Sequence, residues 1–231
     1  MGRTIREVSE AGGHELCAAL DLGDSLYPAI ESCDVAIDFS FHSATLPLAR
    51  AARETGKALV IGTTGHTPEE KEAIRAEASG VPTVWAGNYS IGINLLYFLT
   101  GKAAAILGLD YSPEVVEMHH RHKKDAPSGT AEGLVDVLRK TYGLGEEKVS
   151  HGRHGLIGER ARDEIGVHAL RGGDVIGDHT VYFAGEGERL ELTHRASDRT
   201  VFARGAIRAA VWVRDREPGI YDMRDVLNLK D

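Results

Sequence analysis

The feature that most constrains the fold is the alternation of short apolar segments with helical ones in the first part of the chain. Strands are predicted at Leu16–Leu20, Val35–Phe39, Ala58–Ile61 and Val81–Trp85. One helix is predicted from Ser43 to about Gly56, and a second begins at the capping box Thr67-Pro68-Glu69-Glu70 and runs to about Ala78. Short strands that alternate with helices indicate βα units and a parallel sheet. We therefore predict an α/β domain with a Rossmann-like sheet.

The pattern changes beyond Gly143. Residues 151–199 are rich in glycine and histidine, and they contain alternating strands at Val181–Phe183 and Leu190–Thr193. A hairpin turn is predicted between these strands, at Gly185–Glu188. We expect a separate α+β region with a mostly antiparallel sheet, whose broad face could pair with other subunits.

A helix predicted at Val201–Val213 completes the expected domain organisation. We expect this helix to pack back on the first domain, so that residues 1–90 and 200–231 form a dinucleotide-binding domain. Residues 91–199 would then form a domain for substrate binding and oligomerisation. Two domains of this kind predict a cleft between them.

The composition is typical of a soluble globular protein. The 231 residues carry a formal net charge of −8, which argues against nucleic-acid binding. We expect Cys17 and Cys33 to be small core residues in a reducing compartment, because neither has metal-ligand spacing. The sequence contains no signal peptide and no run of about 18 apolar residues, so we expect a cytoplasmic protein without a membrane span.

The segment Glu117–Ala131 concentrates histidines and cations at the end of a predicted strand. Ser128 is positioned to cap a helix that runs to about Arg139, and the N–H groups of Gly129 and Thr130 would point out of its N-terminus. A helix N-terminus favours an anion, and Lys123 adds positive charge. The segment therefore predicts a site for a carboxylate or phosphate, with imidazoles beside it for proton transfer.

Two other interpretations of this segment are open. His119, His120 and His122 could bind a metal, since His120 and His122 share one face of an extended segment. Cations surround these histidines and no cysteine lies nearby, so zinc is disfavoured and we predict no metal. A solvated basic loop would not explain why the cations precede a helix start. The scattered histidines His151, His154, His168, His179 and His194 are interpreted as structural.

The residues that follow the predicted strands are the second candidate site, because parallel sheets bind ligands at the carboxyl ends of their strands. These residues are Asp21, the segment Asp38–Ser40, Gly62, Thr63, Thr64, Ala86, Gly87, Asn88 and Tyr89. Asp21 is also open to interpretation as a solvated loop acid. Glycines after a strand often only make a turn. The interpretation of Gly62 as a cofactor-binding residue therefore depends on its place in the βα series.

The sequence from His119 to Ala131, which reads HHRHK-x-DAPSGTA, is similar to the signature of the dihydrodipicolinate reductase family. Further similarity occurs at Val60–Gly65, Asn88–Asn94, Arg171–Asp174, Phe183–Arg189 and Tyr221–Leu227. The resemblance runs from about residue 34 to the C-terminus. It implies an NADH- or NADPH-dependent oxidoreductase that reduces a cyclic dicarboxylate, 4-hydroxy-tetrahydrodipicolinate or dihydrodipicolinate, to tetrahydrodipicolinate in lysine and diaminopimelate biosynthesis.

The resemblance also implies residue roles. His119 would be the acid/base residue, with Lys123 as a second proton donor. His120 and Lys123 would contact the substrate, and Gly129 and Thr130, at the helix capped by Ser128, would hold a carboxylate. Residues 62–64 and 86–89 would line the nicotinamide, and Asp21 would lie near the adenosine ribose. That position of Asp21, with no arginine nearby, would favour NADH over NADPH. The expected assembly is a homotetramer formed through the second domain.

The front of the chain departs from the family pattern. A dinucleotide fold begins with a strand and a glycine-rich turn, of which only Gly2 is expected to remain. We expect a gap or re-paired strands. We also expect NADH to bind weakly, and NADPH no better, because the pyrophosphate loses the helix N-terminus and backbone donors that normally hold it. Gly2 and Arg3 are too close to a chain end to be well ordered by themselves. A misplaced start and a truncated variant both fit this pattern. Two functional alternatives stay open: a relic that binds a dicarboxylate but has impaired cofactor binding, and another two-domain dehydrogenase for amino or keto acids.

Overall fold

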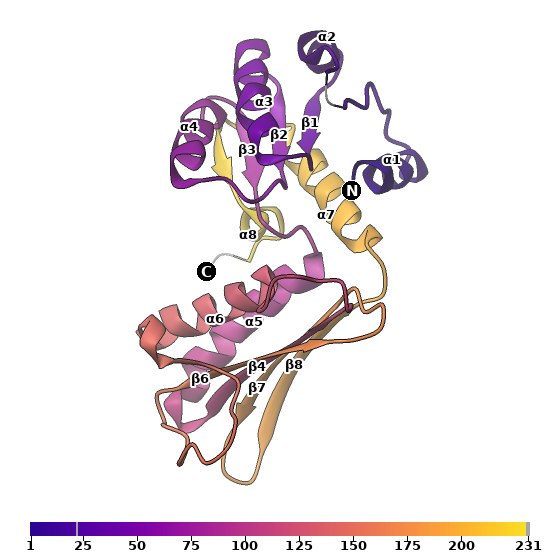
Figure 1. Ribbon diagram of the computed structural model, residues 1–231. Coiled ribbons are helices and arrows are strands. Elements are labelled where there is room, and N and C mark those ends of the chain that lie inside the picture. The colour runs from indigo at the N-terminus through magenta and orange to yellow at the C-terminus, as the bar shows by residue number, and fades with distance from the viewer. Residues whose placement is uncertain (22, 230–231) are drawn as a thin grey trace. The chain divides into compact units, whose positions relative to one another are not determined.

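The alternating strands and helices of the first part of the chain form one parallel sheet. The structure is a computed structural model that describes residues 1–21 and 23–229 (Figure 1). The chain divides into two compact units: unit 1 comprises Met1–Ile91 and Arg199–Asp231, and unit 2 comprises Gly92–Asp198. Each unit has its own sheet.

The sheet of unit 1 has the order β1-β2-β3-β9, and all of its pairings are parallel. Its strands are β1 (Val35–Asp38), β2 (Ala58–Ile61), β3 (Pro82–Trp85) and β9 (Gly219–Tyr221). Its helices are α1 (Gly2–Ala11), α2 (Leu26–Glu31), α3 (His42–Thr55), α4 (Pro68–Ala78), α7 (Thr200–Val213) and α8 (Met223–Val226). Every residue of β2 is buried, as expected of a strand with helices on both faces of its sheet.

Two apolar cores cover the two faces of this sheet. Val60 and Val84 pack with the alanines of α7 on one face, whereas Leu59 and Ile61 pack with α3 and α4 on the other. The capping box of α4 is present, since the Thr67 side chain accepts from the N–H of Glu70 and the Glu70 carboxylate accepts from the N–H of Thr67. The predicted parallel sheet is confirmed.

Several expectations for the front of the chain are wrong. Leu16–Leu20 forms no strand; these residues are exposed, and so is Cys17. A lone apolar pentapeptide gains its strand conformation only from paired neighbours, and the described residues place none beside it. Helix α1 is ordered from Gly2, because Ile5 and Ser9 are buried and the helix packs against α7. The described strands pair without a gap, and β1 lies at the edge.

Unit 2 combines one mixed sheet with two helices. The sheet has the order β5-β6-β4-β7-β8, and its strands are β4 (Ser112–His119), β5 (Val149–His151), β6 (Ile165–Arg171), β7 (Gly177–Ala184) and β8 (Arg189–Ala196). Strands β4, β7 and β8 form the predicted antiparallel part, whereas β6 runs parallel to both β4 and β5. The hairpin turn is confirmed by a bond of 3.0 Å from the Gly185 N–H to the Glu188 carbonyl.

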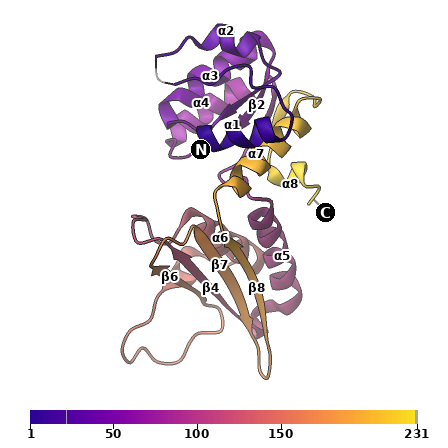
Figure 2. The ribbon, with the colours of Figure 1, turned by 90° about the vertical axis from the view of Figure 1, so that its right-hand side faces the viewer.

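Helices α5 (Ile91–Leu107) and α6 (Gly129–Tyr142) cover one face of this sheet (Figure 2). Short 3-10 turns, η1 (Gly108–Asp110) and η2 (Glu146–Lys148), follow them. The segment Ile91–Asp110 is long and apolar enough to cross a membrane by length and composition. Ile93, Leu96 and Ala104 on this helix belong to the core of unit 2, as in the core helix of a globular domain.

Candidate functional site

The carboxyl end of β4 places the first two functional side chains on the covered face of the sheet. Alternate residues of β4 are buried, so Glu117 and His119 point to the same side as Val115. Nδ1 of His119 lies 2.6 Å from Oε2 of Glu117. The neighbouring strand leaves room here, because a Cβ added at Gly177 would lie 2.9 Å from Nε2 of His119.

Glu117 is fully buried, and an arginine from β6 neutralises it. Both terminal nitrogens of Arg171 donate to its two oxygens, at 2.8 and 2.9 Å. The N–H of Ser128 donates to the same carboxylate at 3.1 Å. Burial by itself would raise the pKa of Glu117, but the hydrogen bonds from Arg171 and His119 outweigh it and the pKa is lowered. Glu117 is therefore a carboxylate whose charge is compensated.

This arrangement fixes the orientation of the His119 ring. A carboxylate can only accept, so Nδ1 of His119 carries the proton that is shared with Glu117, and Nε2 is left for proton exchange. Burial lowers the pKa of His119, and the nearby Lys123 and Arg171 act in the same direction against the opposing effect of Glu117. His119 is thus held as a neutral base with one defined exchangeable nitrogen.

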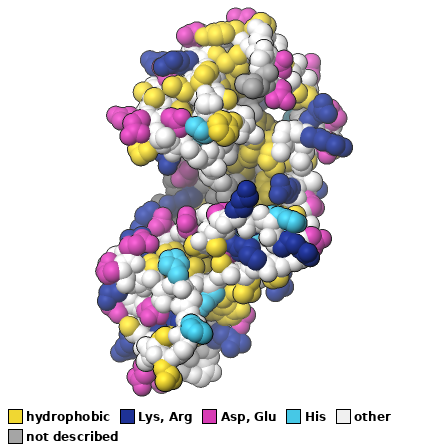
Figure 3. Space-filling view, viewed as in Figure 1, with side chains coloured by type: hydrophobic (Ala, Val, Ile, Leu, Met, Phe, Trp, Pro, Cys, Tyr) yellow, Lys and Arg dark blue, Asp and Glu magenta, His cyan; other side chains and the backbone are white. Residues whose placement is uncertain are grey.

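The loop after β4 holds the other predicted substrate residues. The His120 N–H donates to the Val175 carbonyl at 2.8 Å, and the Lys123 N–H donates to the His120 carbonyl at 3.1 Å. Nδ1 of His120 is buried without a hydrogen-bond partner among the described residues. Nζ of Lys123 lies 2.8 Å from the exposed Asp125 carboxylate. Figure 3 shows Lys, Arg and His side chains gathered on the surface over this loop.

Helix α6 begins where the sequence predicts, at the end of this loop. The Ser128 hydroxyl accepts from the Ala131 N–H at 3.2 Å, which makes Ser128 the N-cap. A Cβ at Gly129 would meet nothing within 4 Å, so the first turn is open to a ligand. The first N–H groups of a helix have no intrahelical acceptor, and an anion can bind them.

His179 on β7, which the sequence pattern indicates to be structural, lies beneath the start of α6. Its Nε2 lies 3.0 Å from the Ser128 hydroxyl, and its ring meets that of His119 edge-on with a centroid distance of 5.1 Å. Its Nδ1 is buried without a hydrogen-bond partner in the described chain. Burial is the main cause that lowers its pKa to about 3. His179 is therefore a neutral side chain that supports both His119 and the helix cap.

The predicted cofactor residues other than Asp21 lie in unit 1, at the carboxyl ends of β2 and β3. Thr63 is buried, whereas Thr64 and Gly87 are exposed. The two loops come together, because a Cβ at Gly87 would lie 3.9 Å from the Thr64 methyl group. Packing also requires a glycine at position 62, because a Cβ there would lie 2.3 Å from the Phe39 ring.

Three other predicted cofactor residues differ in their exposure. Ala86 and Asn88 are half-buried in the loop after β3, and the Asn88 side chain accepts from the Ser90 N–H at 2.8 Å. Tyr89 is buried, and its hydroxyl lies 2.9 Å from each of the carbonyls of Ile61 and Val84. The Tyr89 side chain thus joins β2 to β3 instead of facing a ligand.

Asp21 does not lie at a strand end, because the predicted strand before it does not form. It is exposed and sits in a turn, where its N–H bonds the Asp24 carboxylate at 2.7 Å. The described residues contain no group of three or more His, Cys, Asp or Glu side chains that could hold a metal ion.

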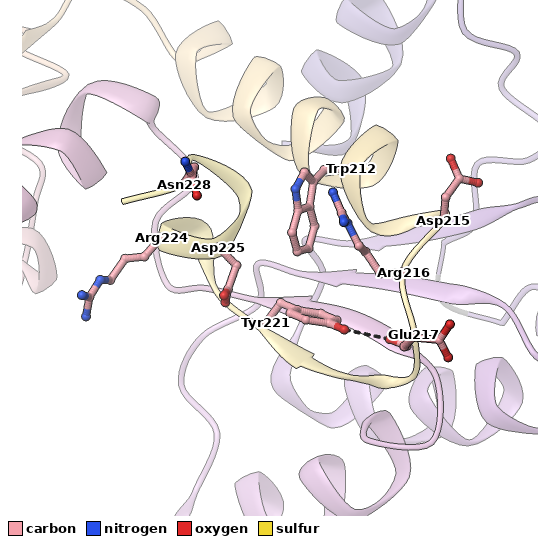
Figure 4. Close-up of a pocket in the computed structure, with 8 residues that line it drawn as sticks. All are labelled: Trp212, Asp215, Arg216, Glu217, Tyr221, Arg224, Asp225 and Asn228. Carbon is pink, nitrogen blue, oxygen red and sulfur yellow. Dashed lines mark hydrogen bonds between the residues drawn. The ribbon is translucent and has the colours of Figure 1, made fainter. Parts of the chain in front are cut away.

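A cavity of about 340 Å³ in unit 1 lies apart from these loops (Figure 4). Trp212 and Tyr221 meet edge-on in it, and the Arg216 guanidinium lies 4.3 Å from the Trp212 ring centre. None of the predicted site residues lines this cavity.

Comparison with known families decides the relationship. The model of the dihydrodipicolinate reductase N-terminus matches residues 1–89, and that of its C-terminus matches residues 92–227. The chain belongs to the dihydrodipicolinate reductase family. Members of this family are NAD(P)H-dependent oxidoreductases whose N-terminal domain binds the nucleotide. The family expected from the His119–Ala131 segment is confirmed.

Relatives match most of the chain. It is 54% identical over 231 residues to the 4-hydroxy-tetrahydrodipicolinate reductase of Akkermansia muciniphila, covering 99% of this chain and 94% of the relative. The reductase of Anaeromyxobacter dehalogenans is 49% identical, with 95% and 81% covered. A solved dihydrodipicolinate reductase from Paenisporosarcina, with dipicolinate bound, has a TM-score of 0.66 at 26% identity, covering 82% of this chain and 71% of that one.

Proposed function

We propose that this chain catalyses the NAD(P)H-dependent reduction of 4-hydroxy-tetrahydrodipicolinate or dihydrodipicolinate to tetrahydrodipicolinate, a step of lysine and diaminopimelate biosynthesis. The observation that carries this proposal is His119, held by the buried Glu117 beside the first turn of α6. One site thus combines an oriented imidazole with an anion-binding helix start. A cyclic dicarboxylate needs both.

The substrate's carboxylates bind at the α6 N-terminus and at the loop before it. The first-turn N–H groups of Gly129 and Thr130 hold one carboxylate, and the Ser128 cap fixes their direction. The Lys123 ammonium, now paired with the exposed Asp125, exchanges that partner for the substrate. Nδ1 of His120, which is buried without a hydrogen-bond partner among the described residues, lies one residue beyond β4 and supplies a further polar contact.

His119 and Lys123 transfer the proton. Reduction of a C=N bond, or of a C=C bond conjugated to it, adds hydride at one atom and requires a proton at another. Because Nδ1 of His119 bonds Glu117, Nε2 is the atom that takes up a proton and delivers it to the substrate. When His119 becomes an imidazolium, the Glu117 carboxylate stabilises it. Lys123 is the second proton donor.

The nicotinamide cofactor supplies the hydride when it is bound. Gly62, Thr63, Thr64 and the segment Ala86–Asn88 line its side of unit 1, since the loops that carry them meet at Thr64 and Gly87. Both loops follow parallel strands at the edge where such sheets bind ligands. The donors in this region are neutral hydroxyl and backbone groups, which suit a carboxamide.

We also propose a cytoplasmic homotetramer formed through unit 2. Helices α5 and α6 occupy one face of its sheet, and Val116, Met118 and Thr180 lie on the opposite face, half-buried. A sheet face without a helix is a surface that a second copy can cover. Light scattering should give four times the chain mass, and Val116→Asp should reduce it.

The activity is tested by following NADH and NADPH consumption with the dicarboxylate substrate present and absent. Substrate-dependent oxidation that His119→Gln abolishes supports the proposal. A chain that binds dipicolinate but oxidises neither cofactor would instead be the dicarboxylate-binding relic. Oxidation that depends only on an amino or keto acid would identify another dehydrogenase.

A further inference from the structure

Asp38 is a buried carboxylate at a strand end, and the proposed mechanism gives it no role. It is the last residue of β1, and only 4% of its surface is exposed. Its neighbours along β1 are apolar or small. A buried charge costs free energy unless several donors bond it, so the groups around Asp38 indicate its role.

Neutral donors from three separate segments satisfy this carboxylate. The hydroxyls of Thr45 and Thr63 donate to it at 2.7 and 2.8 Å. The backbone N–H of Ser40 donates at 3.0 Å, and the Ser40 hydroxyl donates to the same oxygen. The described residues place no Lys or Arg in an ion pair with it. Asp38 therefore acts through hydrogen bonds of fixed direction.

These donors all lie at the carboxyl edge of the sheet. Ser40 follows β1, Thr45 is in the first turns of α3, and Thr63 follows β2. The Ser40 N–H also reaches the Thr63 hydroxyl, at 2.9 Å. Nε2 of the buried His66 lies 2.9 Å from the Thr45 hydroxyl and makes a second link to the loop after β2. One carboxylate thus joins the loops after β1 and β2.

The core of unit 1 does not require this network. The strands already pair through Asp38↔Ile61, and the apolar cores on both faces cover them. The network instead sets the position of Thr63, which lies between Gly62 and the exposed Thr64. Loss of the carboxylate would leave the hydroxyls of Thr45 and Thr63 without their acceptor, and residues 62–64 would move.

We propose that Asp38 is a positioning residue that fixes the loop of Gly62, Thr63 and Thr64 for the nicotinamide cofactor. The inference rests on the proposed function, because that function places the nicotinamide beside these residues. Because Asp38 is buried, it acts through the residues that bond it and not by direct contact with the cofactor or substrate. It sets the affinity for the cofactor and leaves the proton chemistry of unit 2 unchanged.

The test compares Asp38→Asn and Thr63→Val with Thr63→Ser and Thr83→Val. Thr63→Ser keeps the hydroxyl that donates to Asp38. Thr83 is a matched control, since it is a fully buried threonine of the same sheet whose hydroxyl bonds the Ala78 carbonyl at 2.9 Å. NADH affinity is measured by fluorescence titration without substrate, together with KM for NADH, kcat and Tm.

We expect Asp38→Asn and Thr63→Val to weaken NADH binding about tenfold, the loss of roughly one hydrogen bond to a charged group. In Asp38→Asn, KM for NADH should rise as the affinity falls, and kcat at saturation should stay within about twofold, as for an interaction lost equally from ground and transition states. Thr63→Ser should restore the affinity. Thr83→Val should lower Tm and leave NADH affinity unchanged.

Unchanged NADH affinity in Asp38→Asn would overturn the inference and leave Asp38 a structural residue. If Asp38→Asn does not fold, Thr45→Val decides, because Thr45 donates to Asp38 and is not one of the residues that line the nicotinamide. Unchanged NADH affinity in Thr45→Val would then overturn the inference. A wild-type chain that binds NADH but does not reduce the dicarboxylate refutes the proposed reaction alone, since the titrations contain no substrate. A wild-type chain that binds neither nucleotide refutes the inference as well.

Discussion

Glu117 and Asp38 are both buried carboxylates near the carboxyl end of a strand, but they are satisfied by different kinds of groups. Glu117 in unit 2 is bonded by a guanidinium and an imidazole, whereas Asp38 in unit 1 is bonded by hydroxyl and backbone N–H groups. Breaking a charge pair leaves an uncompensated charge, and that costs more than losing a neutral bond. This difference agrees with the proposal that unit 2 transfers the proton and unit 1 holds the nicotinamide.

The largest effect is expected from His119→Gln. A positioned acid/base residue typically contributes about 10²–10⁴-fold, so kcat should fall by a factor in that range. NADH affinity should not change, because the predicted cofactor residues lie in unit 1. Steady-state kinetics combined with an NADH titration measure both. An unchanged kcat would transfer the acid/base role to His120.

Arg171→Leu should produce the next largest effect, on stability. It leaves the fully buried Glu117 without its cation, which typically costs about 3–5 kcal/mol. Denaturant unfolding measures this loss. The control is Arg195→Leu, which removes a mostly exposed arginine 3.6 Å from Asp178 and should cost about 0–1 kcal/mol. Equal losses in the two variants would show that Glu117 does not depend on its charge partner.

Lys123→Ala should weaken binding of a dicarboxylate such as dipicolinate. Truncating one partner of a charge-assisted pair typically costs about 2–5 kcal/mol. Calorimetry on the wild type and the variant measures the difference. Lys124→Ala is the matched control, since Lys124 is an exposed neighbour in the same loop. Dipicolinate binding as tight as in the wild type would remove Lys123 from the substrate site.

The same contrast explains what the sequence could predict. The strands β1–β3, the capping box at Thr67 and the N-cap at Ser128 depend on residues within a few positions of each other, and the sequence predicts them. Leu16–Leu20 has the composition of a strand but no partner among the described residues. Composition cannot reveal that, because pairing is a long-range property.

The side-chain network of unit 2 was missed for the same reason. Arg171 and His179 reach Glu117 and Ser128 from 54 and 51 residues away. A signal for Glu117 was present, however. The alternation Val115, Glu117, His119 places all three on one face of β4, which selects His119 over His120 as the residue facing the core. Asp38 is predicted to lie at a strand end, but its donors come from three segments, so the sequence does not reveal their network.

The smallest effect should appear in the pH dependence of stability. Because His179 has a pKa of about 3 when folded, against about 6.5 when unfolded, the unfolded chain binds its proton first as pH falls. Stability is therefore lost between pH 6.5 and 3, and this histidine contributes at most about 1.4 kcal/mol per pH unit. Its surroundings are Ser128 and the charged or titratable groups of Glu117, His119, Lys123 and His194.

His179→Gln should remove this dependence, and the glutamine can still bond the Ser128 hydroxyl. Unfolding is measured in denaturant from pH 6.5 to 5, above the range in which most carboxylates titrate. The variant should lose less stability than the wild type over that interval. The exposed His151 provides the control, and His151→Gln should keep the wild-type slope. Equal slopes for all three proteins would mean that His179 accepts a proton in the folded chain, which would bring a second charge to the Glu117 site.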